Sequence, residues 1–340
     1  MTDFLIITNN SHKNSPRAEQ ILYTLTSKGY DAEYLETPRT KNQLKIAKHL
    51  FNKVKEKRPL AIHILNVFDH LFLPLVSLKG KYYKYLIYDI RVLRGVRLES
   101  EYRNKLFRVF EIFERYIAKK ADYITTANRL MAKKIESYIR VKNKPIIVLP
   151  NYPSKQFLDW NKQEVEMLKK HCRKVQKVIL YVGRITNLEI SLFFLVSIDQ
   201  LKDQNIAFWF IGDGKKKLID ELKKRGNVTL FGWKNRKEIS DFIKASDVCV
   251  IPRPETPATA YSNDEDTWKL NEYLVHNKVI VATGITISHE IPNLISGAPS
   301  DISRLLRLAL TKKAYCCKPR FWEDFCEPKI LQLYKSLEDN

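Results

Sequence analysis

Residues 246–284 read SDVCVIPRPETPATAYSNDEDTWKLNEYLVHNKVIVATG, and this stretch decides the fold class. Two short apolar runs, Val248–Ile251 and Val279–Ala282, have the length and β-branched content of buried strands. Between them lie a polar loop that holds Asp264, Glu265 and Asp266 and a helical segment, Thr267–Val275. In an open parallel sheet, ligands bind outside the carboxyl ends of the strands. We therefore predict a binding site at the loop-to-helix junction, where helix amides suit phosphate and carboxylates suit sugar hydroxyls.

The same alternation of strand and helix extends through the rest of the chain and predicts a doubly wound α/β protein. Further strands are predicted at Phe4–Thr8, Ala32–Leu35, Ala61–Leu65, Tyr85–Tyr88, Tyr123–Thr126, Ile146–Leu149, Val178–Val182, Ala207–Ile211 and Val228–Phe231. Helices are predicted at Pro16–Ser27, Asn42–Glu56, Asn104–Lys119, Leu188–Asp203, Lys215–Arg225, Arg236–Ala245, Trp268–His276 and in the amphipathic stretch after Pro319. The pattern breaks at Asn151–Lys177, which we interpret as an interdomain linker.

Composition limits the class of protein. The chain has 340 residues, 44% of them hydrophobic, which suits two globular domains. Its five cysteines are odd in number and lack zinc-site spacing, so a reduced, intracellular setting without a metal centre is expected. The N-terminus lacks the pattern of a signal peptide, and the longest apolar patch, Val67–Leu78, is too short to span a bilayer.

The net charge of +21 suits an anionic partner, which could be nucleic acid, lipid head groups or a phosphorylated substrate. A surface of ordinary solvated lysines is the alternative. Recognition motifs for nucleic acid are not found, and the basic residues are spread along the chain, so no nucleic acid is expected.

Two predicted strands of the second half end in glycine. Tyr181–Arg184 places a guanidinium where a strand opens into a loop, and Ile211–Gly214 marks another strand end. A guanidinium pairs well with phosphate oxygens, so Arg184 and the loop at Gly212 are candidates for a diphosphate site; an ordinary turn is the alternative for Gly212. A dinucleotide-binding fingerprint, a P-loop and a nucleophile elbow are all absent, which disfavours those classes of enzyme.

Several segments of the second half, in their order and spacing along the chain, resemble the C-terminal domain of the retaining family-4 glycosyltransferases. These segments are Tyr181–Arg184, Ile211–Gly214, Val228–Trp233, Ala245–Pro252 and Lys269–Gly284. Elsewhere, the segments similar to one branch of that family are Ser15–Arg17, Lys28–Tyr30, Tyr88–Arg91, Phe321–Glu323 and Leu333–Tyr334. The resemblance implies the GT-B fold, with two Rossmann-like, doubly wound parallel-sheet domains facing a cleft and a C-terminal helix packing back towards the first. The implied parts are an acceptor domain at 1–160, a donor domain at 161–318 and a crossover helix at 319–340.

The resemblance also implies roles for acidic residues. The family has two glutamates in a fixed spacing: Glu272 occupies the second position and is implied to bind the donor ribose, with a solvated helix charge as the alternative. Asp264 occupies the first position and is implied to contact the transferred sugar. Where the family has a lysine five residues after the strand-end arginine, this chain has Glu189. We therefore expect Lys269, one helical turn before Glu272, to supply the second cation, with Lys215 as the alternative.

Glycosyl transfer requires stabilisation of the charge on the departing diphosphate. We expect the cations and the amides at the start of the helix to supply it, with no metal ion or other cofactor required. The predicted donor-binding residues are Arg184, Lys269, Glu272, Asp264, Thr267 and Gly212.

In the N-terminal half, Asp89 and Arg91 lie at the carboxyl end of a predicted strand, and Arg17 opens a helix. Arg17 and Arg91 are candidates for the acceptor side, with a solvated helix-start arginine as the alternative for Arg17. His63 is interpreted as a core or wall residue. The predicted catalytic residues are Asp89, Asp264 and Arg184.

The resulting hypothesis is a retaining, metal-independent hexosyltransferase that uses a nucleotide-sugar donor, a UDP-sugar in preference to a GDP-sugar. Its expected acceptor is a glycan or a lipid-linked molecule, and its expected location is the cytoplasm or the cytoplasmic face of the membrane, held by basic residues on an anionic surface. Two alternatives stay open: a GT-B protein that binds a sugar nucleotide without transfer, such as an epimerase or an inactive partner subunit, and a basic nucleic-acid-binding protein.

Overall fold

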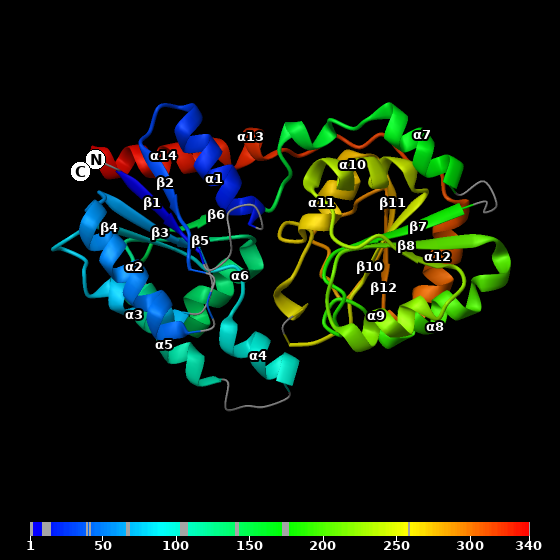
Figure 1. Ribbon diagram of the computed structural model, residues 1–340, viewed down its shortest axis with the longest axis horizontal. Helices are drawn as coiled ribbons and strands as arrows, with labels where there is room; N and C mark the ends of the chain where they lie inside the picture. The colour runs from blue at the N-terminus through cyan, green and yellow to red at the C-terminus, as the bar shows by residue number, and fades with distance from the viewer. Residues whose placement is uncertain are drawn as a thin grey trace. The chain divides into compact units, whose positions relative to one another are not determined.

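Strands and helices alternate along the chain and assemble into two separate parallel sheets, as the computed structural model shows (Figure 1). The structure describes residues 3–8, 15–38, 40, 42–65, 69–102, 108–139, 143–171, 177–257 and 259–339. The chain divides into a first unit, Met1–Asn151 with Trp322–Asn340, and a second unit, Tyr152–Phe321.

The first unit contains a six-stranded sheet in the order β2-β1-β3-β4-β5-β6, with parallel pairing throughout. Its strands are β1 Phe4–Ile7, β2 Ala32–Leu35, β3 Ala61–Leu65, β4 Tyr85–Asp89, β5 Tyr123–Thr126 and β6 Ile146–Val148. These apolar runs are almost entirely buried in the central strands, which explains their near-continuous hydrophobicity.

The helices of the first unit are α1 Pro16–Ser27, α2 Gln43–Lys57, α3 Asp69–Val76, α4 Arg94–Tyr102, α5 Phe110–Lys120, α6 Arg129–Lys134, α13 Trp322–Phe325 and α14 Glu327–Glu338. Helices α2, α3 and α5 pack side by side, and α14 packs against α1. Trp322 Nε1 donates to Thr24 Oγ1 at 2.9 Å, and the Tyr334 hydroxyl lies 2.8 Å from His63 Nδ1. The C-terminal helix therefore packs on the first unit, as predicted.

The second unit repeats the architecture with the sheet order β12-β11-β10-β7-β8-β9, again parallel. Its strands are β7 Lys177–Val182, β8 Ile206–Ile211, β9 Val228–Leu230, β10 Val248–Pro252, β11 Val279–Thr283 and β12 Leu294–Gly297. Its helices are α7 Lys162–His171, α8 Leu192–Gln200, α9 Lys216–Lys223, α10 Arg236–Ala245, α11 Trp268–Val275 and α12 Ile302–Thr311.

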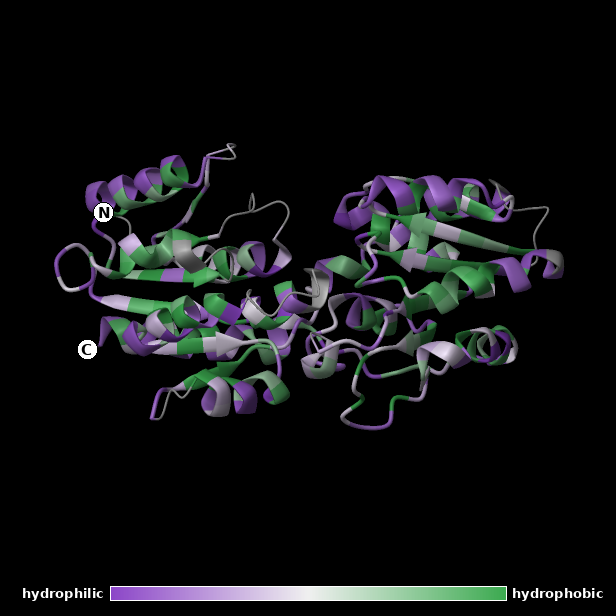
Figure 2. Cartoon of the chain, turned by 90° about the horizontal axis from the view of Figure 1, so that it is seen from below, coloured by the Kyte–Doolittle hydropathy of each residue, from purple (hydrophilic) through white to green (hydrophobic). Residues whose placement is uncertain are grey.

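Alternate residues of each strand in the second unit enter two different core layers. Ile179 and Tyr181 of β7 face α8, α9 and α12, whereas Val178 and Leu180 face α7, α10 and α11. Figure 2 shows the result, with mainly hydrophobic strands and helices that carry a hydrophilic side. The predicted doubly wound parallel sheets are thus confirmed.

Two predictions need correction, and a third lies partly outside the described residues. Much of the predicted linker Asn151–Lys177 is ordered in the second unit, because α7 packs on α10 and places Val165 in the core. The edge strand β12 was missed, since its four residues end in Ser296 and Gly297 and carry little strand signal. The predicted helix Asn104–Lys119 begins in residues outside the described ranges, and the described part, α5, starts at Phe110.

Among the helices that the structure describes, none has the length and apolar content needed to cross a bilayer.

Candidate functional site

The carboxyl ends of β7 and β8 form a floor of bare backbone. Gly183 and Gly212 follow these strands with φ of +143° and +131°, values that side-chain-bearing residues rarely adopt. A Cβ on Gly212 would lie 1.9 Å from the Gly183 carbonyl oxygen, so any larger residue would separate the two strand ends. This close approach leaves peptide groups uncovered by side chains at the mouth of the sheet.

Lys269, in the first turn of α11, reaches over this floor. Its Nζ lies 2.7 Å from the position that a Cβ on Gly183 would take, and 4.7 Å from the centroid of the Tyr181 ring. It also donates a 2.9 Å hydrogen bond to Glu189 Oε2. The sequence-predicted cation is therefore at the predicted strand end, but it shares its charge with a carboxylate.

Glu189 joins two cations. Besides Lys269, it binds Arg253, whose Nε lies 3.1 Å from Oε2 and whose second guanidinium nitrogen lies 3.4 Å from Oε1. Burial on its own would raise the pKa of Glu189, but the charges of Arg253 and Lys269 and their hydrogen bonds hold the pKa well below its usual range. Glu189 is thus a carboxylate at neutral pH, and the group of three carries one net positive charge.

Arg184 is the cation of this strand end that stays open. Its side chain is exposed and has no hydrogen bond or ion pair within the described part of the chain, while its carbonyl oxygen accepts 2.6 Å from the Tyr181 hydroxyl. The backbone is thereby fixed and the guanidinium remains available. Such a group suits a phosphate oxygen.

Glu272, one turn after Lys269, is 3% exposed and already has partners. Its Oε1 accepts from Trp268 Nε1 at 2.5 Å and pairs with Arg236 at 2.6 Å. The Arg236 guanidinium lies over the rings of Phe157 and Trp268, at 4.6 and 5.3 Å from their centroids. Burial raises the pKa of Glu272, and the charge and hydrogen bond of Arg236 oppose that rise.

Asp264 lies in the loop before α11 and is 3% exposed. Its Oδ1 accepts from the backbone amide of Ser288 at 2.8 Å and its Oδ2 from the hydroxyl of Ser288 at 2.9 Å, with His289 Nδ1 at 3.2 Å from Oδ2. Thr267, the residue before α11, is also engaged: its hydroxyl donates to the Asn263 carbonyl at 2.7 Å. Both residues hold the loops around the helix start, whose first amides have no partners within the helix itself.

In the first unit, the predicted residues gather at the carboxyl ends of β3, β4 and β5. Arg17 is completely buried and donates to Asp89 Oδ1 at 3.1 Å, to the Leu149 carbonyl at 2.6 Å and to Asn151 at 3.1 Å. Asp89 Oδ1 also accepts from Thr125 at 2.7 Å. Arg17 is therefore an internal tie between α1, β4 and β6, contrary to the alternative of a solvated helix-start arginine.

Arg91 and His63 flank that buried pair. Arg91 Nε lies 3.4 Å from Asp89 Oδ2, and its side chain is 27% exposed. His63 is buried, and burial lowers its pKa to about 4, so its ring is neutral at physiological pH. Its bond to Tyr334 makes it part of the wall, in keeping with the interpretation from sequence.

Sequence reasoning missed Arg236 and Arg253. Arg253 directly follows β10, so its place at a strand end gave the same signal as Arg184. Arg236 is the first residue of α10, inside the Asn235–Glu238 capping box, and only the tertiary fold brings it to Glu272. Within the described residues, no group of three His, Cys, Asp or Glu side chains is placed to hold a metal ion.

Residues 176–302, which contain this strand-end cluster, match the family described as glycosyl transferases group 1. The chain is also 27% identical over 133 residues to the capsular polysaccharide biosynthesis glycosyltransferase CapH of Staphylococcus aureus, in an alignment that spans 36% of this chain and 37% of that protein.

Solved structures match over the whole length. A sucrose-phosphate synthase from Thermosynechococcus elongatus superposes with a TM-score of 0.78 at 12% identity, covering 100% of both chains. Anabaena HepE, in a complex with UDP and glucose, gives 0.70 at 11% identity and 100% coverage of both. The architecture is GT-B. The family match supports a glycosyl transferase of group 1, and it falls on the second unit, which carries Arg184, Lys269 and Glu272.

Proposed function

We propose that the chain is a glycosyltransferase that moves a hexose-type sugar from a nucleotide-sugar donor to a glycan or lipid-linked acceptor, with retention of configuration. The observation that carries the proposal is Lys269 over the glycine floor, with an exposed Arg184 in the adjoining loop that makes no ion pair among the described residues, inside the segment that matches group 1 glycosyl transferases. One cation above bare peptide groups, a second in the adjoining loop and a helix N-terminus suit a diphosphate.

In this proposal, Arg184 and Lys269 stabilise the charge that develops on the departing nucleoside diphosphate, so that no metal ion is required for that step. Lys269 has one hydrogen bond to Glu189, and an ammonium group has three donors, so it can bind a phosphate without leaving Glu189. Glu189, itself held by Arg253, then keeps Lys269 in place and also competes with the phosphate for its charge.

Glu272 is proposed to bind the donor ribose through Oε2, because the contacts with Trp268 and Arg236 both fall on Oε1. Thr267 and Gly212 contribute backbone to the same site. Asp264 is proposed to act indirectly, because Ser288 already donates hydrogen bonds to both of its oxygens. The loop that Asp264 holds in this way lies beside the start of α11.

On the acceptor side we propose Arg91 as the contact residue and the buried Arg17–Asp89 pair as its support, because Arg17 itself is inaccessible. We extend the proposal to a UDP-sugar donor, since HepE carries UDP in its complex, and to an association with an anionic membrane surface on the cytoplasmic side, since the net charge is +21.

One observation favours a second candidate, a GT-B protein that binds a sugar nucleotide without transferring the sugar. Glu189 neutralises part of the charge at the diphosphate position, where the resembled family has a lysine. Weaker stabilisation of the leaving group would slow transfer more than binding.

A donor panel tests the proposal. We expect a UDP-sugar to bind and to be slowly hydrolysed, and the Glu272→Ala variant to lose donor affinity by about tenfold, the value of one charged hydrogen bond. Glu221→Ala, a change at a partly exposed helix position of the same unit, is the control. Binding without hydrolysis or transfer to any glycan or lipid-linked acceptor would favour the second candidate; no binding of any nucleotide sugar would refute both.

A further inference from the structure

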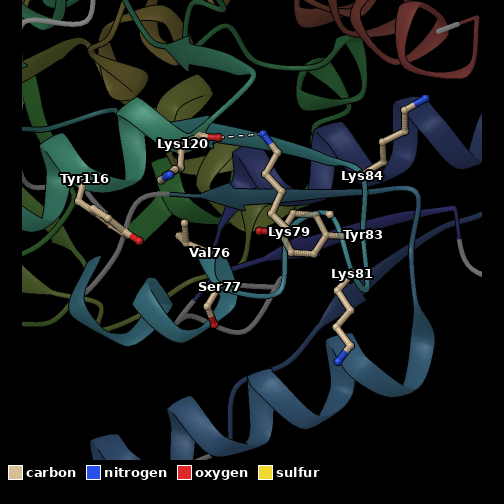
Figure 3. Close-up of a pocket in the computed structure, with 9 residues that line it drawn as sticks. Val76, Ser77, Lys79, Lys81, Tyr83, Lys84, Tyr116 and Lys120 are labelled. Atoms are coloured by element: carbon tan, nitrogen blue, oxygen red, sulfur yellow. Dashed lines mark hydrogen bonds between the residues drawn. The ribbon is translucent and has the colours of Figure 1, made fainter.

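The first unit contains a pocket of about 710 Å³ that is lined by lysines and tyrosines (Figure 3). Its wall is formed by the end of α3, by the loop that leads into β4 and by the end of α5. The lining residues are Val76, Ser77, Lys79, Gly80, Lys81, Tyr83, Lys84, Tyr116 and Lys120.

This pocket lies at the amino ends of the strands, whereas the buried Arg17–Asp89 pair lies at their carboxyl ends. Lys84 immediately precedes β4, and Lys120 lies three residues before the start of β5. Parallel strands all point the same way, so these residues mark the amino ends of the strands, whereas Asp89 and Thr125 mark the carboxyl ends. The pocket is therefore separate from the acceptor side proposed above.

The lining holds four lysines and no carboxylate. Lys79 is fixed by a 2.6 Å ion pair with Asp122 and a 2.9 Å bond to the Lys120 carbonyl, while Lys81, Lys84 and Lys120 are exposed. Asp122 balances one charge, which leaves the pocket with about three positive charges. Such a concentration of one sign in a concave site attracts anions.

The loop that carries the lysines is held in shape by its own backbone. Gly80 donates to the Tyr83 carbonyl at 2.9 Å, and Tyr82 donates to the Leu78 carbonyl at 2.9 Å. The Tyr83 hydroxyl donates to the Leu75 carbonyl at 3.0 Å and anchors the loop to α3. Three of the four lysines therefore stand on a structured loop, and Lys120 ends α5.

Next to the pocket, α5 and the residue before it expose an apolar stripe. Val109, Ile112 and Tyr116 follow one another at helical spacing and are 50%, 64% and 45% exposed. Tyr116 also lines the pocket, so the stripe runs directly into the lysines. Exposed apolar residues along a helix beside basic ones are typical of a segment that lies in a membrane interface.

We propose that this face of the first unit binds an anionic phospholipid surface, with a head-group phosphate in the lysine pocket and with Ile112 and Tyr116 in the boundary between head groups and acyl chains. Charge complementarity and the adjoining apolar stripe together select a lipid surface over a free anion, since a soluble anion would make no use of the stripe. The inference rests on the membrane association within the proposed function and is independent of glycosyl transfer.

Sedimentation of the full-length chain with vesicles tests the proposal. We expect binding to vesicles of phosphatidylcholine mixed with phosphatidylglycerol and little binding to phosphatidylcholine alone. The variant Lys81→Gln/Lys84→Gln/Lys120→Gln should lose about a hundredfold in partitioning, since each lysine near such a surface contributes about a factor of five. The control Lys217→Gln/Lys223→Gln/Lys224→Gln, with the same loss of charge on exposed positions of the second unit, should bind like the wild type.

A second variant, Ile112→Ser/Tyr116→Ser, keeps every charge and should weaken partitioning by about tenfold or more, because it removes apolar contact with the interface. The proposal is overturned if the pocket variant and the control bind vesicles equally. It is also overturned if soluble glycerol phosphate binds the wild type as well as the vesicles do, or if a polynucleotide is retained and the vesicles are not. Donor binding, measured on the same variants, should be unchanged, so failure here is distinct from failure of the proposed function.

Discussion

The two units end their parallel sheets in opposite ways. In the first unit, Arg17 and Asp89 form a pair with both side chains fully buried, tied to Thr125. In the second unit, Arg184 stands exposed, and Lys269 rests on Glu189 with 12% of its side chain exposed. Two six-stranded parallel sheets with different strand orders thus carry a closed ionic cluster in one unit and an open one in the other.

The difference teaches where a ligand can bind. A buried pair whose charges satisfy each other supports the fold, and removing one partner leaves an uncompensated charge. In an open cluster with net positive charge, the cations are only partly neutralised by their own contacts. An anionic ligand therefore stabilises such a cluster further. We therefore propose that the first cluster supports the fold and that the second binds an anionic ligand.

The largest effect is expected from opening the closed cluster. Asp89→Ala leaves Arg17 buried without its counter-charge and should lower the free energy of unfolding by about 3–5 kcal/mol. Urea unfolding of the full-length chain measures it. Glu33→Ala, which breaks the partly exposed pair with Lys57, is the control and should cost about 1 kcal/mol or less. An equal effect of the two changes would show that burial of the Arg17–Asp89 pair does not matter.

The second-largest effect is expected from acid, which should lower the free energy of unfolding through His63, beside the closed cluster. The pKa of buried His63 is lowered to about 4, whereas an unfolded histidine titrates near 6.5. Between these values the unfolded chain binds more protons than the folded one, so stability is complete above pH 6.5 and falls as the pH drops towards 4, by up to about 3 kcal/mol. In His63→Gln the slope of unfolding free energy against pH should decrease over this range; an unchanged slope would contradict the assignment.

The third prediction concerns the open cluster, where a substitution is expected to affect the binding of UDP. Lys269→Ala should weaken UDP binding by about 10- to 100-fold, because a hydrogen bond to a charged group contributes about 1.5–3 kcal/mol. Isothermal titration calorimetry measures the change, and Lys217→Ala, at an exposed position of α9, is the control. Unchanged affinity would place the diphosphate elsewhere.

The smallest effect is expected from Glu189→Gln. This change frees Lys269 and leaves it close to Arg253, so a diphosphate would relieve their repulsion. UDP affinity should rise by about fivefold, or about 1 kcal/mol, and the gain should shrink in high salt. A loss of affinity would mean that Glu189 is needed to orient Lys269 more than it competes for its charge.

Much of the fold could be predicted from sequence because the strands are short, apolar and buried. The predicted strand at Ala61–Leu65 and the predicted helices at Pro16–Ser27 and Arg236–Ala245 match the structure at both ends. The linker prediction failed at α7 because half of that helix is charged, and Val165, its one deeply buried residue among the side chains that the structure describes, gives too little periodic signal.

The candidate site was only partly predictable. Arg184 and Gly212 stand at strand ends, and strand ends can be located from local sequence alone. The hydrogen bonds between Ser288 and Asp264 could not be predicted from local sequence. The two residues are 24 positions apart, and the fold sets the conformations of their loops.

By itself, the sequence determined two doubly wound units, because the alternation of apolar runs and amphipathic segments is a local property of the chain. Only the tertiary structure decided which charges cancel. Glu189 meets Arg253 and Lys269 across separations of 64 and 80 residues, and Arg17 meets Asp89 across 72. Charge pairing depends on distances and burial in the folded chain, and these arise when the sheets and helices pack.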